Sequence, residues 1–157
     1  MKKKVICLVL VMMLILGTMG STALASTHRP KSVISTSVWL DINRFINLEY
    51  ERKINPAMSL YVAPFIGIAR PTWVGARAGG KYYFLGTAPE GLWIGAFGTV
   101  SYKSIPGFSE INFGGAANAG YKLFITDIFT VEANVGLDYI LVGGFNVVWG
   151  VNVGIGL

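Results

Sequence analysis

The 157-residue sequence predicts an all-β fold, an eight-stranded antiparallel up-and-down barrel that spans a membrane. From 32 to 157 the chain forms eight segments of roughly ten to fourteen residues, alternating apolar with small or polar side chains and separated by Asn, Pro, Gly and Asp. Charged residues make up only 13% of the chain, against about a quarter in soluble domains. An export signal precedes these segments, so the predicted barrel belongs to an exported protein.

Residues 1–25 are predicted to be a cleaved signal peptide. Lysines occupy positions 2–4, an apolar run covers 5–16, and Ala23-Leu24-Ala25 has the small-x-small pattern of a cleavage site. The apolar run is shorter than the roughly 20 residues of a transmembrane helix, which is the alternative interpretation. The only cysteine, Cys7, lies within this segment. Cleavage of the segment would also remove its three lysines, which lowers the net charge of the chain from +5 to +2. The remaining charge gives no reason to expect nucleic-acid binding.

The rest of the chain has room for one small domain. Residues 26–31 form a short polar lead, and residues 32–157 form the barrel. Eight tilted strands of about ten residues account for most of that length. The predicted strands cover 32–41, 43–54, 57–70, 72–85, 91–104, 109–123, 127–141 and 144–157.

Strand parity assigns the two faces of the sheet. In 43–54 and 72–85 the even positions are mostly apolar, whereas in 127–141 and 144–157 the odd positions are apolar. Side chains alternate between the two faces of a strand. We therefore expect the apolar parity to face lipid and the other parity to fill the interior.

The interior parity carries acids and bases in similar number. An eight-stranded barrel is only wide enough for side chains to fill, so charges inside it must pair. Strand direction predicts that Glu49, Arg77 and Glu132 lie at one depth, with Glu51 and Lys81 somewhat lower. We predict an ion-paired plug, with a narrow pore lined by the same residues as the alternative. Its residues are Glu49, Glu51, Arg77, Lys81, Lys122, Glu132 and Asp138, and Asp41 and Lys53 share their parity.

Two hairpins repeat one pattern, in which an aromatic strand end is followed by a polar turn and a new strand. They cover 50–60 and 121–131, and a looser copy covers 82–93. These hairpins and the alternating C-terminal strand resemble small bacterial outer-membrane barrels of the OmpA-like and OmpX-like kind. The resemblance implies that the hairpin turns are periplasmic, and that the barrel-assembly machinery is a partner during biogenesis. This chain ends in Leu157, whereas that family ends in an aromatic residue.

Arginines at the opposite end are candidate lipid contacts. With the hairpins periplasmic, Arg44 and Arg70 fall on the outward parity at the extracellular ends of two neighbouring strands. Guanidinium groups suit the phosphates of lipopolysaccharide. Ordinary snorkelling to the membrane interface is the alternative interpretation.

The sequence contains no pattern that predicts catalysis. Ester hydrolysis in a barrel would need a histidine, and the single one, His28, lies in the polar lead. We also expect no metal site and no cofactor. The favoured function is that of a monomeric outer-membrane barrel with a structural or envelope role. A narrow channel is one alternative, and a soluble secreted barrel that binds an apolar ligand is another.

Overall fold

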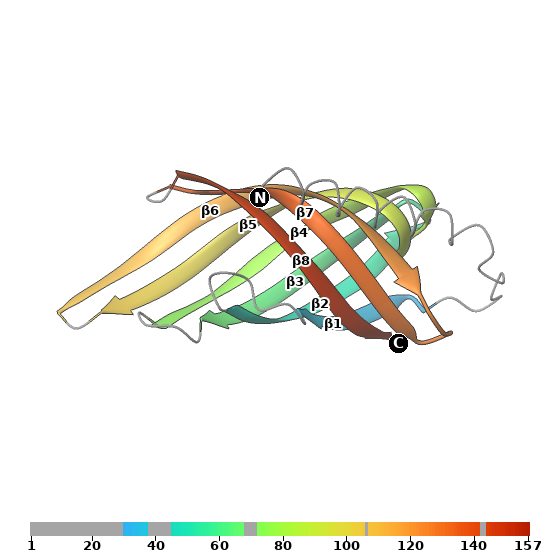
Figure 1. Ribbon diagram of the computed structural model, residues 1–157, viewed down its shortest axis with the longest axis horizontal. Coiled ribbons are helices and arrows are strands. Elements are labelled where there is room, and N and C mark those ends of the chain that lie inside the picture. Colours follow the sequence, from blue (N-terminus) through green and yellow to red (C-terminus); the bar gives the residue numbers. More distant parts are fainter. Residues whose placement is uncertain (1–29, 38–44, 68–71, 106, 142–143) are drawn as a thin grey trace, which may run out of the picture.

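The computed structural model describes residues 30–37, 45–67, 72–105, 107–141 and 144–157, which form a closed barrel (Figure 1). Each strand pairs antiparallel with its neighbours in sequence, and the first strand also pairs with the last. Within these residues, no helix is long and apolar enough to cross a membrane. The strands are β1 (Ser32–Ser37), β2 (Phe45–Asn55), β3 (Met58–Gly67), β4 (Thr72–Thr87), β5 (Glu90–Ile105), β6 (Phe108–Phe124), β7 (Phe129–Ile140) and β8 (Gly144–Gly156).

The fold prediction is therefore confirmed, and most strand boundaries agree within two or three residues. The predicted signal segment 1–25 and His28 lie outside the described residues. So do the predicted ends of the first and third strands, at 38–41 and 68–70.

The connection between the predicted strands 91–104 and 109–123 is shorter than predicted. β5 continues to Ile105 and β6 begins at Phe108, with Gly107 at a φ of 82° in the tight connection. Lys103 pairs in register with Glu110, and the Lys103 Nζ lies 3.7 Å from the Glu110 Oε1. Alternation therefore continues through this segment, and β5 and β6 run beyond their neighbours (Figure 1).

Short turns collect at one end of the barrel, here called the turn end. This end holds residues 56–57, 88–89 and 125–128, together with the last residue, Leu157. The Asn55 side-chain oxygen accepts a hydrogen bond from the Ala57 amide at 2.9 Å, which stabilises the first of these turns. The Leu157 amide donates to the Ser32 carbonyl at 2.8 Å, and this bond joins the two ends of the sheet. The opposite end, here called the loop end, holds the other ends of the strands, such as Ser37, Gly67, Ile105 and Gly144.

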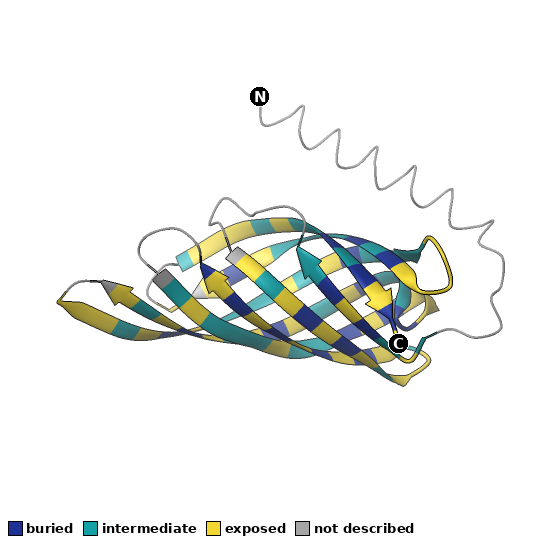
Figure 2. Cartoon of the chain, turned by 90° about the horizontal axis from the view of Figure 1, so that it is seen from below, coloured by how far each residue is buried: buried dark blue, intermediate teal, exposed yellow. Residues whose placement is uncertain are grey.

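Burial alternates along the strands as the sequence predicts. Figure 2 shows buried and exposed segments following one another along single strands. On β2 the odd positions Glu49 and Glu51 are buried, and the even positions Leu48 and Tyr50 are exposed. On β7 the parity reverses, with Glu132 buried. The polar parity therefore faces the lumen, and the apolar parity forms the outer surface.

The lumen also contains large aromatic side chains that the prediction did not include. Tyr61, Phe65, Trp93 and Phe97 are buried on the inward face of β3 and β5. Glycines on neighbouring strands provide the space, since a Cβ on Gly120 would lie 2.6 Å from the Trp93 ring. The aromatic rings of β3 and β5 therefore flank the inward-facing charged side chains Arg77 and Lys81 of β4, which lies between these strands.

Candidate functional site

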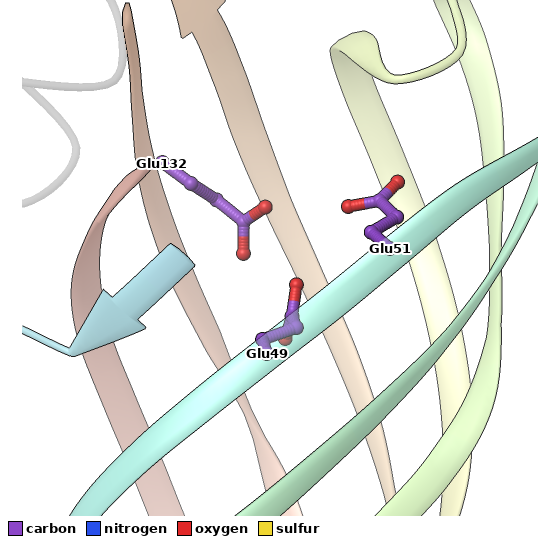
Figure 3. Close-up of side chains that lie close together, drawn as sticks. All are labelled: Glu49, Glu51 and Glu132. Carbon is purple, nitrogen blue, oxygen red and sulfur yellow. The ribbon is translucent and has the colours of Figure 1, made fainter. Parts of the chain in front are cut away.

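Five ionisable side chains meet inside the barrel near the turn end, and we call them the charge cluster. They are Glu49 and Glu51 of β2, Lys81 of β4, Lys122 of β6 and Glu132 of β7. Figure 3 shows the three glutamates converging from two parts of the wall. Their carboxylate oxygens lie within 4.8 Å of one another. Strands that are not neighbours in the sheet thus contribute to one site across the lumen.

Lys81 is the centre of the cluster. Its ammonium nitrogen lies 2.7 Å from Glu49 Oε1, 3.1 Å from Glu51 Oε2 and 3.0 Å from Glu132 Oε2. The same nitrogen lies 4.6 Å from the centre of the Trp93 ring and 5.1 Å from that of the Tyr61 ring. Aromatic faces attract cations, so the two rings add to the attraction of the carboxylates.

Lys122 is the second cation of the cluster. It forms a short hydrogen bond with Glu51 and lies 2.9 Å from Glu132 Oε2. Its distance to Glu49 Oε1 is 4.0 Å. Lys122 and Glu51 are fully buried, and Lys81 and Glu132 are each 2% exposed. Charges at this depth persist only when partners compensate for their lost hydration.

Neutral side chains complete the hydrogen bonding of the carboxylates. Tyr83 and Ser59 each donate a hydroxyl hydrogen bond to Glu51 Oε1, at 2.6 and 2.5 Å. The Asn152 amide donates to Glu132 Oε1 at 3.1 Å. Tyr83, Ser59 and Asn152 were not among the predicted site residues. Their inward parity was the available signal, but neutral polar residues are frequent on that parity.

Arg77 lies outside the charge cluster, contrary to the predicted depth. It stands four residues nearer the loop end than Lys81 on β4, and its guanidinium lies 3.9 Å from Asp138 Oδ2. The rings of Phe65 and Phe97 flank it at 5.1 and 5.4 Å. The tilt of the strands causes the difference, because residues at one height come from different register positions on opposite walls.

Other predicted site residues take no part in the cluster. Lys53 lies half-buried on the inward parity of β2, two residues nearer the turn end than Glu51. Asp41, Arg44 and Arg70 lie outside the described residues.

A cavity of about 80 Å³ lies on the loop-end side of the charge cluster. Glu49, Lys81 and Glu132 line it together with polar side chains that include Asn118 and Asn134. The volume is enough for several water molecules. The Trp93 indole nitrogen and the Asn118 side-chain oxygen are buried and have no hydrogen-bond partner among the residues that the structure describes. Buried polar atoms beside such a cavity are normally satisfied by ordered water.

Three converging carboxylates also raise the question of a metal ion. Oxygen ligands at this spacing suit a hard cation. The Lys81 ammonium, however, lies within 3.1 Å of one oxygen of each glutamate. In this arrangement the ammonium takes the place that a cation would fill.

The outer surface carries aromatic side chains toward both ends. Tyr82, Phe84 and Phe129 are exposed toward the turn end, and Tyr102 and Tyr139 toward the loop end. Aromatic rings are enriched where a bilayer meets water. Large aliphatic side chains lie exposed between them, including Leu60, Val62, Ile94 and Leu137.

The barrel is similar in structure to the N-terminal β-barrel domain of OprF from Pseudomonas aeruginosa. The TM-score is 0.63 at 16% sequence identity, and the match covers 83% of this chain and all of that domain. No family model matches the sequence, and no curated protein matches it. The resemblance to OmpA-like eight-stranded barrels is thus confirmed at the level of fold.

Proposed function

We propose that this chain is an integral outer-membrane barrel protein with a structural role in the cell envelope, whose lumen the charge cluster closes to ions. The distribution of polarity carries the proposal, because ionisable side chains are buried inside and large apolar side chains are exposed outside. A bilayer is the solvent that favours such an outer surface. The fold shared with the OprF barrel domain supports this location.

The closure of the lumen rests on two layers near the turn end. The charge cluster draws on β2, β4, β6 and β7, so its ion pairs cross the lumen. Beyond it, Ala88 and Pro89 of the β4–β5 turn are buried, and Ala88 packs with Tyr83 and Trp93. The Ala88 amide donates to the Pro56 carbonyl at 2.8 Å, which fixes this turn against the β2–β3 turn. An ion crossing the barrel would have to separate several buried ion pairs.

Electrophoresis of the detergent-extracted protein tests the membrane-barrel assignment. A folded outer-membrane barrel resists detergent unfolding, so we expect its mobility to change only after boiling. Membrane fractionation should place the protein in the outer membrane. A chain that stays soluble without detergent and shows no mobility change would contradict the proposal.

A narrow channel is the second candidate function, and the cavity beside the charge cluster favours it. Single-channel recording in planar bilayers separates the two candidates. The closed barrel should show no steady conductance, whereas a channel should show discrete current steps that scale with salt concentration.

The soluble ligand-binding barrel is contradicted by the positions of the charges. That alternative requires an apolar lumen, with Glu49, Lys81 and Glu132 on the outside. These three residues are buried inside the barrel.

Two proposals concern export and assembly. We expect cleavage after Ala25, so N-terminal sequencing of the mature protein should begin at Ser26. Depletion of the barrel-assembly machinery should reduce the amount of folded protein, and the purified barrel should sediment as a monomer.

Arg44 and Arg70 remain candidate contacts for lipopolysaccharide phosphates at the extracellular rim. Replacement of both by Ser should reduce the lipopolysaccharide that copurifies with the barrel. An unchanged amount would indicate ordinary interfacial arginines instead.

A further inference from the structure

The charge cluster contains one more acid than base. Three carboxylates, Glu49, Glu51 and Glu132, face two ammonium groups, Lys81 and Lys122. All five side chains are at least nine-tenths buried. An uncompensated charge in such a position costs several kcal/mol. The geometry therefore favours a third positive charge from a source other than these two lysines.

Nearby ionisable groups do not supply that charge. Arg77 lies 3.9 Å from Asp138 and balances that carboxylate. Lys53 forms no ion pair within 4 Å with any residue that the structure describes. Four other side chains that contact the charge cluster are uncharged. They are Tyr61 of β3, Tyr83 of β4, Trp93 of β5 and Asn152 of β8.

Glu49 has the fewest partners of the three glutamates. Glu51 accepts bonds from both lysines, Ser59 and Tyr83, and Glu132 contacts both lysines and Asn152. Glu49 receives one close contact, from Lys81 at 2.7 Å, and Lys122 is 4.0 Å away. A neutral carboxyl group is therefore most easily accommodated at Glu49. The Lys81 bond falls on Oε1, which leaves Oε2 to carry a proton.

The cavity provides a path to this carboxyl group. Glu49 lines the cavity, and so does Trp93, which is 3% exposed and whose indole nitrogen has no hydrogen-bond partner among the described residues. An unpartnered donor beside a polar cavity of this volume indicates bound water. The turn end is closed by the buried Ala88–Pro89 turn, and Figure 3 shows the β4–β5 hairpin bending over beside Glu51. Water in the cavity would then reach Glu49 from the loop end.

We infer that the charge cluster is a proton-binding site in which Glu49 holds one exchangeable proton, supplied through a water-filled cavity. The proton makes the cluster neutral, with two ionised carboxylates opposite two ammonium groups. Nothing else is consumed, because protonation and release exchange the proton with water. This inference goes beyond the proposed function and does not depend on it, since it concerns the folded barrel in any environment.

The direction of the pH dependence follows from proton linkage. A glutamate in an unfolded chain is ionised above about pH 4.3. If the folded barrel keeps the Glu49 proton at neutral pH, unfolding releases that proton, and stability falls as the pH rises. This fall of stability with rising pH requires the Glu49 carboxyl group, so Glu49→Gln should abolish the part of the pH dependence that Glu49 causes.

Urea unfolding of the folded barrel in detergent micelles tests the inference with two matched variants. Glu49→Gln resembles the protonated side chain but has no proton to release on unfolding. Its urea midpoint should therefore equal that of the wild type at about pH 4 and lie above it at neutral pH. Glu51→Gln makes the same replacement of a carboxyl group by an amide, but it removes an ionised partner of both lysines. Its unfolding equilibrium constant should therefore rise by about 100-fold. As the pH rises from about 5 to about 7, the wild-type midpoint should fall, and that of Glu49→Gln should fall less.

Infrared spectroscopy supplies a readout independent of stability. The wild type at neutral pH should show the carbonyl band of a protonated carboxyl group, shifted in deuterated water. Glu49→Gln should lack that band. The inference is overturned if the wild type lacks the band, or if the neutral-pH midpoint of Glu49→Gln does not lie above that of the wild type. A wild-type midpoint that rises specifically with Na⁺ or K⁺, without the band, would assign the third charge to a metal cation instead and would also overturn it.

Discussion

Lys81 should contribute more to stability than any exposed lysine, and Lys81→Met tests this. Methionine keeps the unbranched apolar stem of lysine but lacks the ammonium group, which lies between 2.7 and 3.1 Å from three glutamates. With Lys81 removed, Lys122 is the cation that remains in the charge cluster. Removing one partner from a buried ionic network costs about 3–5 kcal/mol.

Reversible urea unfolding in lipid vesicles, followed by the electrophoretic mobility shift, measures this loss. With a urea slope of about 2 kcal/mol per molar, the midpoint should fall by about 2 M. Lys103→Met is the matched control, because Lys103 pairs with Glu110 at 3.7 Å and both side chains are about a quarter exposed. An exposed pair of this kind contributes less than about 1 kcal/mol.

A second variant separates charge balance from packing. Lys81→Met combined with Glu132→Gln removes one base and one acid together, so part of the lost stability should return. The reasoning is refuted if Lys81→Met and Lys103→Met shift the midpoint equally. It also fails if the double variant loses the sum of the two single losses, because non-additivity is the measure of direct coupling.

Two further predictions use the same unfolding measurement. Gly120→Ala should lower the urea midpoint clearly, because its Cβ would lie 2.6 Å from the Trp93 ring, whereas Gly98→Ala has open space around its Cβ and should leave the midpoint nearly unchanged. Equal midpoints for the two variants would argue against a tightly packed lumen. Tyr83→Phe should cost about 1.5–3 kcal/mol by removing the 2.6 Å hydrogen bond to Glu51, and a loss below about 0.5 kcal/mol would mean that Glu51 finds another donor.

The fold could be predicted because alternation is visible directly in most strands. β2 and β7 each place acids on one parity and apolar side chains on the other, so hydropathy alone separates lumen from outer surface. β3 is different, because Leu60 and Val62 alternate with Tyr61 and Ala63, and both faces are mostly apolar. The interior aromatic residues of β3, Tyr61 and Phe65, were missed for this reason.

The candidate site could be predicted only in part. Parity identifies the charges that share the inward face, and the structure places Glu49, Lys81 and Glu132 there. Which of them touch depends on the tilt and stagger of strands on opposite walls, which no local pattern records. Arg77 illustrates this limit, since it lies near Asp138 rather than at the depth of Glu49.

The bond between Glu51 and Lys122 joins residues 71 positions apart, on strands β2 and β6. These strands lie on opposite walls, so the bond can form only when the sheet has curled far enough to close. Before the barrel closes, the charged side chains of the cluster lie in water or in an apolar phase without their ion-pair partners. Closing a long loop before its contacts form is entropically costly and slows folding. The charge cluster therefore makes the native state cooperative, because an incompletely closed barrel leaves its interior charges uncompensated.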